Sequence, residues 1–142
     1  MKIARTALVT YSAMDMYKLV EAVPAYPQFL SWCTGTQVHE QSDVLQKASL
    51  TVLVAGVRQQ FTTVNTLVLG ESIEMKLLKG PFKNLQGQWR FLQLGDVGCK
   101  ISLELDFEMT NALMSSVFGK GFGKVADRLE DDFCKRADQV YP

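Results

Sequence analysis

Residues 101–109 read ISLELDFEM. Every second side chain in this stretch is large and apolar, and the side chains between them are polar or acidic. Successive side chains of a β-strand point to opposite faces of its sheet, so the stretch predicts a strand with one buried and one solvent-facing side. We expect the acidic side chains of the second set, Glu104, Asp106 and Glu108, to face away from any cavity.

The period of two continues on the N-terminal side of this strand, back to about residue 34. In residues 48–54, for example, apolar side chains alternate with Ser49 and Thr51. Turn-forming residues divide residues 34–109 into about six antiparallel strands, and they stand at Ser42-Asp43, Ala55-Gly56, Gly70-Glu71, Gly80-Pro81 and Gly95 to Gly98. Residues 2–11 predict one further strand, so we expect about seven strands in the sheet.

Helices are expected before and after the six strands along the chain. Ser12 is placed to cap a short helix over residues 13–22, which Pro24 ends because proline has no backbone N–H. The aromatic segment 26–33 predicts one more helical turn. Beyond Asn111, apolar side chains recur at helical spacing and predict one helix of about 25 residues: Phe118, Phe122, Val125, Leu129, Phe133 and Ala137. This order of elements is typical of the α+β class, with the helices on one face of an antiparallel sheet.

The composition favours a single globular domain over residues 1–142, in the cytoplasm. The 15 basic and 15 acidic side chains cancel, which removes the general attraction that a basic protein has for nucleic acid and argues against a DNA partner. Three cysteines without a CxxC pair favour neither disulfides nor zinc and fit a reducing compartment. The N-terminal residues lack the apolar core of a signal peptide, and no apolar run predicts a membrane span.

Catalytic groups are scarce in the sequence. His39 is the only histidine, so a metal site built on two histidines is excluded. Its position in a predicted strand, near the polar residues Gln37 and Glu40, indicates a structural or surface role. Cys33 and Cys99 have no adjacent base that would activate them as nucleophiles. We therefore expect a protein that is not an enzyme and that requires no metal or cofactor.

Three stretches taken together resemble one known family. They are residues 12–33, which end in YPQFLSWC, residues 80–91, GPFKNLQGQWRF, and residues 105–111, LDFEMTN. Along almost its whole length the chain is similar to the coenzyme Q-binding START-domain (RatA-like) family, within the wider polyketide cyclase/dehydrase and lipid transport superfamily that includes the birch-pollen allergens. The resemblance implies a helix-grip fold, in which a curved antiparallel sheet wraps around a long C-terminal helix and encloses a lipophilic cavity.

The same resemblance implies three alternative functions. The first is to bind or chaperone a hydrophobic ligand, ubiquinone or a related polyprenyl lipid, in support of cellular respiration. The second is that of the RatA-type toxins, which bind the large (50S) ribosomal subunit and block subunit association. The third is a polyketide cyclase or aromatase activity, which the absence of an acid and base pair facing the expected cavity disfavours.

Candidate ligand-binding residues are the apolar side chains expected at the cavity and its entrance. They are Tyr26, Phe29, Trp32, Val52, Phe82, Trp89, Phe91, Leu105, Phe107, Phe118 and Phe122. The aromatic loop at residues 26–32 is either a mouth for a lipid tail or a permanently packed lid. Phe82 follows a turn, and either inserts into a membrane surface while Lys83 meets a lipid phosphate, or folds back onto the core. The first alternative for Phe82 implies transient contact with the inner membrane face.

Basic residues of the C-terminal helix form the remaining candidate site. Lys120, Lys124 and Arg128 follow one another at intervals of four residues and, with Lys83, are candidates for contacts with phosphate or ribosomal RNA. Acidic residues at 127 and 130–132 favour the alternative of a solvated face whose charges pair with one another. Three glycines at positions 119, 121 and 123 weaken this helix and indicate either close packing, a kink or a ligand beside its backbone.

Overall fold

The computed structural model describes residues 1–141 and contains seven strands and a set of helices. In chain order the elements are β1 (Lys2–Val9), α1 (Ala13–Glu21), the 3₁₀ helix η1 (Val23–Gln28), β2 (Cys33–Gln41), β3 (Leu45–Val54), β4 (Val57–Val68), β5 (Ser72–Lys79), β6 (Phe82–Leu94), β7 (Gly98–Met109), α2 (Ala112–Met114), the π-helical turn η2 (Ser115–Gly119), α3 (Lys120–Asp127) and α4 (Leu129–Val140). The seven strands and their order confirm the predicted α+β class.

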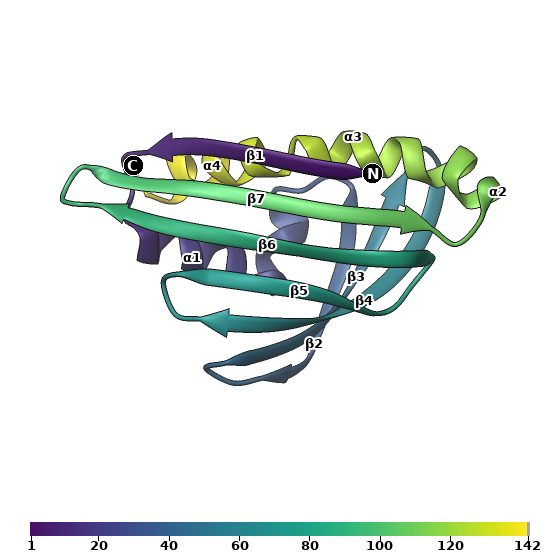
Figure 1. Ribbon diagram of the computed structural model, residues 1–142, viewed down its shortest axis with the longest axis horizontal. Coiled ribbons are helices and arrows are strands. Elements are labelled where there is room, and N and C mark those ends of the chain that lie inside the picture. Colours follow the sequence, from purple (N-terminus) through teal and green to yellow (C-terminus); the bar gives the residue numbers. More distant parts are fainter. Residues whose placement is uncertain (142) are drawn as a thin grey trace.

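All seven strands belong to one antiparallel sheet with the order β1-β7-β6-β5-β4-β3-β2. Strands β2 to β7 follow one another as a meander, and β1 joins the sheet beside β7. The sheet is curved, and α1, α3 and α4 lie on the same side of it (Figure 1). The chain therefore places every long helix against one face and leaves the other face of the sheet uncovered.

Strand β7 shows the alternation that its sequence predicts. Its residues 101, 103, 105, 107 and 109 are all buried, whereas Glu104 and Glu108 are exposed. The residues with inward side chains lie opposite residues of β1 and β6, as Leu105 lies opposite Ile3 and Gly87. The apolar parity of this strand therefore fixes the register of its neighbours, because a slip by one residue would turn the apolar set to solvent.

The first helix begins where its capping residue predicts. The Ser12 side chain accepts a hydrogen bond of 3.1 Å from the Asp15 backbone N–H, and α1 then runs from Ala13 to Glu21. The connection that follows contains the 3₁₀ helix η1, which begins at Val23 and so covers an earlier stretch than the predicted turn at 26–33. Proline at the start of η1 explains the shift, because its fixed φ suits the first helical position.

The C-terminal helix differs from the single regular helix that was expected. It begins at Ala112, where the Asn111 side chain accepts from the Met114 N–H at 2.9 Å, and it ends at Val140. A π-helical turn occupies residues 115–119, and the helix is interrupted at Arg128 between α3 and α4. Extra residues in one turn change which side chains face the sheet, so the irregularities adjust the apolar stripe to a curved partner.

Phe82 lies inside the core and not at an exposed tip. Its side chain is 4% exposed, and its ring centroid lies 5.1 Å from that of Phe122 and 5.4 Å from that of Phe61. The hypothesis that Phe82 inserts into a membrane surface is therefore wrong. The turn at Gly80-Pro81 directs the ring back into the protein, where aromatic packing and burial stabilise it.

The glycines of the C-terminal helix allow it to approach the sheet closely. A β-carbon added at Gly121 would lie 2.4 Å from Cγ1 of Val54, and one added at Gly119 would lie 3.1 Å from Cγ of Met109. Both distances are shorter than ordinary van der Waals contact. Among the alternatives for these glycines, the structure therefore shows close packing together with a π-helical turn.

We predict that Gly121→Ala destabilises the protein. Alanine would gain about 1 kcal/mol in helix propensity, but the clash with the buried Val54 side chain should cost more, leaving a net loss of about 1–2 kcal/mol. Chemical denaturation measures this difference. Gly35→Ala is the matched control, because the nearest atoms to its new β-carbon lie 3.9 Å away. Equal stability of the Gly121→Ala protein would contradict the close contact between α3 and the end of β3.

Candidate functional site

A cavity of about 90 Å³ lies between the inner face of the sheet and the helices. Its walls come from η1, the central strands and the C-terminal helix, and they are almost entirely apolar. The lining residues are Val23, Tyr26, Trp32, Ala48, Leu50, Phe61, Thr63, Asn65, Met75, Leu85, Trp89, Leu103, Leu105, Phe122, Val125, Ala126, Leu129 and Phe133. The cavity lies where the helix-grip fold is expected to hold its ligand.

Five of the predicted ligand-binding residues line this cavity: Tyr26, Trp32, Trp89, Leu105 and Phe122. The other six do not line it and belong to the surrounding apolar core, namely Phe29, Val52, Phe82, Phe91, Phe107 and Phe118. Phe82 packs against Phe107, whereas Phe91 packs against Trp89 and Phe118 against Phe122, both of which line the cavity. The alternation along a strand thus predicts which side chains are buried, but not which of the buried side chains line a cavity.

The cavity has one polar wall that the sequence did not bring to attention. Thr63 donates a hydrogen bond of 2.9 Å to the side-chain oxygen of Asn65, and the Asn65 amide donates to Gln46 at 2.9 Å. Gln46 in turn donates to the backbone carbonyl of Glu21 at 2.9 Å. Thr63 and Asn65 follow the buried Phe61 at steps of two residues, so they lie on the same face of β4. The alternation of side chains along the strand could therefore have identified them as inward-facing. Burial of such a chain is tolerated because its members are hydrogen-bonded.

Trp32 supplies a second polar group at the cavity. It lines the void, and its indole Nε1 is buried without a hydrogen-bond partner among residues 1–141. An indole N–H can only donate, and leaving a buried donor unpaired costs roughly 1–3 kcal/mol. An occupant that offers an oxygen acceptor to Trp32 would recover that free energy.

The aromatic loop closes the cavity. The ring centroids of Tyr26 and Phe29 lie 5.4 Å and 5.2 Å from that of Phe133 on α4, both nearly edge to face. The Arg136 guanidinium lies 5.1 Å from the Phe29 ring centroid and donates to Gln28 at 2.8 Å. The Tyr26 hydroxyl donates to the carbonyl of Val20, and burial raises the pKa of Tyr26, so that the hydroxyl remains a neutral donor. The packed lid is thus the alternative that this conformation shows.

The volume of the cavity sets a limit on its occupant. Pockets that hold drug-sized ligands have volumes of about 300–1,000 Å³, and the space here is about 90 Å³. A polyprenyl quinone therefore requires that the lid, the helix or both move outward.

One buried carboxyl group lies elsewhere. Glu130 on α4 is 3% exposed, and one of its carboxyl oxygens has no hydrogen-bond partner among the described residues. Burial, assisted by the nearby Asp131, raises the pKa of Glu130 to about 7, against a smaller opposing effect of Arg5. Glu130 does not line the cavity, so it does not supply the cavity with an acid or a base of the kind that a cyclase would need.

His39 and the acidic residues of β7 take the positions that their sequence predicts. His39 is exposed, and its Nε2 lies 2.7 Å from the Ser49 hydroxyl, which lies 2.6 Å from the hydroxyl of Thr62. This short chain of polar groups holds β2, β3 and β4 together. Glu104 and Glu108 point away from the cavity. The described residues contain no cluster of three or more side chains suited to a metal ion.

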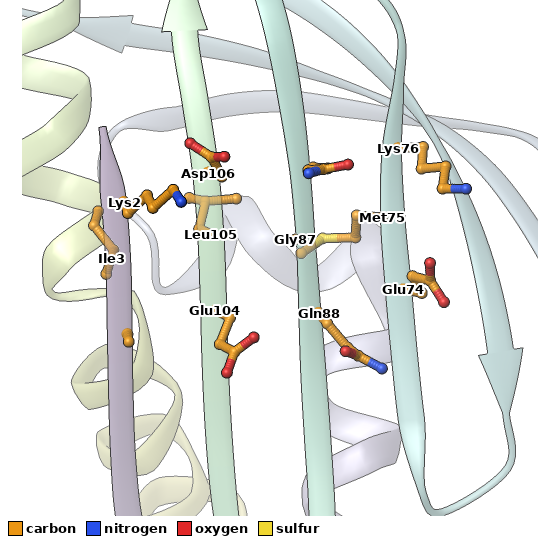
Figure 2. A pocket seen from close by; sticks show the side chains of 12 residues that line it. Lys2, Ile3, Glu74, Met75, Lys76, Gly87, Gln88, Glu104, Leu105 and Asp106 are labelled. Carbon is orange, nitrogen blue, oxygen red and sulfur yellow. The ribbon is translucent and has the colours of Figure 1, made fainter.

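A shallow hollow of about 420 Å³ marks the uncovered face of the sheet (Figure 2). Gly87 lies at its centre, between Leu105 and Met75 on the adjacent strands. Polar side chains from four neighbouring strands surround it: Lys2, Glu74, Lys76, Gln86, Gln88, Glu104 and Asp106. Acidic and basic groups are mixed here, so the hollow shows no preference for a ligand of one charge.

The four candidate phosphate-binding residues are all exposed. Lys120 and Lys124 line a groove of about 480 Å³ between the C-terminal helix and the end of β7. Lys83 and Arg128 do not line this groove. The structure thus brings together two of the four residues.

Separately, no helix within residues 1–141 is both long and apolar enough to cross a membrane.

Comparison with known proteins gives closely related sequences over the whole chain. Residues 9–134 match the family model described as polyketide cyclase/dehydrase and lipid transport. A Pseudomonas aeruginosa protein named "Ribosome association toxin RatA" is 45% identical over 139 residues, which are 98% of this chain and 96% of that protein. A protein of the same name from Escherichia coli K12 is 45% identical over 140 residues, 99% of this chain and 89% of the relative.

Solved structures share the fold. The Zhui aromatase/cyclase from Streptomyces sp. R1128 superposes with a TM-score of 0.87 at 16% identity, covering all of this chain and 96% of that one. A START superfamily protein from Mycobacterium smegmatis gives a TM-score of 0.81 at 20% identity, with 98% of both chains covered. These likenesses confirm the predicted helix-grip, START-type fold.

We predict that Glu130→Gln stabilises the protein at high pH. The carboxyl pKa rises from 4.5 to about 7 on folding, so the folded state binds more protons than the unfolded state between these values. Stability is therefore lost as the pH rises through this window, by up to about 3 kcal/mol. Denaturation at pH 5 and pH 8 should show a higher free energy of unfolding for the variant than for the natural protein at pH 8 only. Glu104→Gln, at an exposed site, is the control and should show no such gain.

Proposed function

Because the chain belongs to the polyketide cyclase/dehydrase and lipid transport family and is RatA-like within it, we propose that it associates with the ribosome. The observation that carries this proposal is the 45% identity, over almost the full length of both chains, to bacterial proteins named for ribosome association. We take the partner to be the large subunit and the consequence to be blocked subunit association. This function places the protein in the cytoplasm and gives it no enzymatic role.

The geometry of the site is consistent with a function at the surface. The cavity, at about 90 Å³, is smaller than the pockets that hold drug-sized ligands, and Glu130, the carboxyl group with the strongly raised pKa, does not line it. Distant structural relatives include an aromatase/cyclase, but a shared fold does not transfer a reaction. The cyclase alternative therefore has no support from the arrangement of residues around this cavity.

Sedimentation tests the proposal directly. Purified full-length protein should co-sediment with isolated large subunits and not with small subunits, and it should lower the yield of joined ribosomes when both are mixed. Raising the salt concentration should weaken the association if charged groups contribute to it. Protein that stays at the top of the gradient with either subunit at low salt would refute ribosome association.

A second candidate function is the binding of a hydrophobic ligand in the cavity, such as a ubiquinone-like lipid that supports respiration. The specific observation in its favour is the unpaired Nε1 of Trp32 in a cavity whose walls are mostly apolar. A quinone carbonyl would accept a hydrogen bond from this group, while the ring and the isoprenoid tail would be buried against apolar walls. Binding requires that Tyr26 and Phe29 move away from Phe133 to enlarge the cavity.

We expect a ubiquinone with a short isoprenoid tail to quench the fluorescence of the protein if this second function exists. Trp32→Phe removes the donor and should weaken quenching of the remaining Trp89, which lines the same cavity. Ala48→Leu adds three carbons to the cavity wall and should abolish quenching while leaving ribosome association intact. Circular dichroism verifies that each variant is folded. Quenching that is the same in all three proteins would place the quinone outside this cavity.

A further inference from the structure

We propose that the groove between the C-terminal helix and the end of β7 binds the phosphodiester backbone of ribosomal RNA, with Lys120 and Lys124 as its phosphate contacts. This inference rests on the proposed ribosome association and specifies the surface responsible for it. The surface is named here the lysine groove, and its helix wall consists of Ser115, Gly119, Lys120, Gly123, Lys124 and Asp127.

The shape of the lysine groove comes from small residues between two lysines. Gly119 and Gly123 are buried on the helix wall, close to the side chains of Met109 and Met1, and the groove of about 480 Å³ runs beside them and the strand residues 107–109. Lys120 and Lys124 lie one helical turn apart, a spacing at which β-carbons are about 5–6 Å from each other. Two ammonium groups on one side of an open groove can meet two successive phosphates of a single strand.

The charges around the groove leave both lysines without an ion-pair partner in the described part of the chain, and so available to bind phosphate. The acidic residues of the helix were expected to pair with its basic residues, but two of them pair with β1 instead. Arg5 lies 3.5 Å from the carboxylate of Asp127 and 3.8 Å from that of Asp131. Neither Lys120 nor Lys124 has a carboxylate within 4.0 Å in the described part of the chain. Arg5 thus offsets the charge of Asp127, the acidic residue of the helix wall.

Besides Asp127, a second carboxylate in the groove opposes an anion. Glu108 lies on the strand wall, exposed to solvent. An RNA strand would therefore follow the helix side of the groove, where the Ser115 hydroxyl offers a further donor to a phosphate oxygen. The π-helical turn at residues 115–119 forms the start of this wall, and such turns are frequent at functional sites.

The composition of the surface favours RNA over a lipid membrane. Two aliphatic side chains, Leu113 and Val117, are exposed on the turn before Lys120. However, the large hydrophobic side chains exposed within residues 1–141 include no aromatic ring, whereas helices that lie in a membrane interface use Trp and Phe as anchors. The net charge of the protein is zero, so a polyanion must be held by a local set of cations such as this one.

The test compares two double variants of the full-length protein. Lys120→Ala with Lys124→Ala removes the lysine groove, and Lys76→Ala with Lys100→Ala removes the same charge from exposed positions on the uncovered face of the sheet. Binding to purified large subunits is measured at several salt concentrations. We expect the first variant to bind roughly tenfold more weakly at low salt and its log–log salt slope to fall by about 1.4, which is about 0.7 for each lost phosphate contact. The control should bind like the natural protein.

The outcomes separate the surface from the function. If the natural protein does not bind ribosomal subunits, the proposed function itself fails. If it binds and the Lys120/Lys124 variant binds equally well with the same salt slope, only the lysine groove is refuted. Equal weakening of both double variants would also refute it, because general charge would then explain the effect.

Two further measurements strengthen the test. Lys120→Arg with Lys124→Arg keeps both charges and should retain binding, which shows that charge and not packing matters. Vesicles of anionic phospholipid serve as the competing partner. Vesicle binding that depends on the two lysines, together with ribosome binding that does not, would assign the groove to membranes and overturn the proposal.

Discussion

The contact between helix α3 and the inner face of the sheet is the interaction on which the rest of the structure depends. The ring centroid of Phe122 lies 5.0 Å from that of Phe107 and 5.1 Å from that of Phe82, which brings β6, β7 and the helix together. Gly121 allows the approach, because any side chain there would meet Val54. The same contact places Phe122 in the cavity wall and turns Lys120 and Lys124 outward. One helix therefore serves as cavity wall and as charged surface.

The sequence predicts those features that follow from local periodicity. Alternation in residues 101–109, the turn-forming residues between strands and the cap at Ser12 all correspond to the structure, because each depends on a few adjacent residues and the backbone geometry that they favour. The stripe of the C-terminal helix is correct in its spacing but not in its regularity. The π-helical turn at residues 115–119 and the interruption at Arg128 leave no mark in the spacing of the apolar residues, so periodicity does not predict them.

The candidate site is less predictable for a physical reason. A cavity is the space that remains after side chains have packed, so inward-facing Val52 and Phe107 fill the core while Thr63 and Asn65 line the void. Hydrogen bonds and ion pairs between distant positions are equally hidden from local patterns. Arg5 and Asp127 are separated by 122 positions along the chain, and they meet because β1 pairs beside β7 and α3 packs near β1.

The two proposed roles of the helix place different demands on it. An occupant larger than the present cavity must displace either the aromatic loop or α3. Tyr26 and Phe29 are partly exposed already, and their movement away from α4 would mainly uncover one buried ring, that of Phe133. Phe118 is 0% exposed and Phe122 is 5% exposed, and moving them would expose two large aromatic side chains at a cost of about 25 cal/mol per Å². The loop is therefore the weaker boundary, and the cavity can enlarge there while the lysines remain in place. Sites that do not share moving parts contribute to binding almost independently, so a ligand in the cavity need not alter the affinity of the lysine groove.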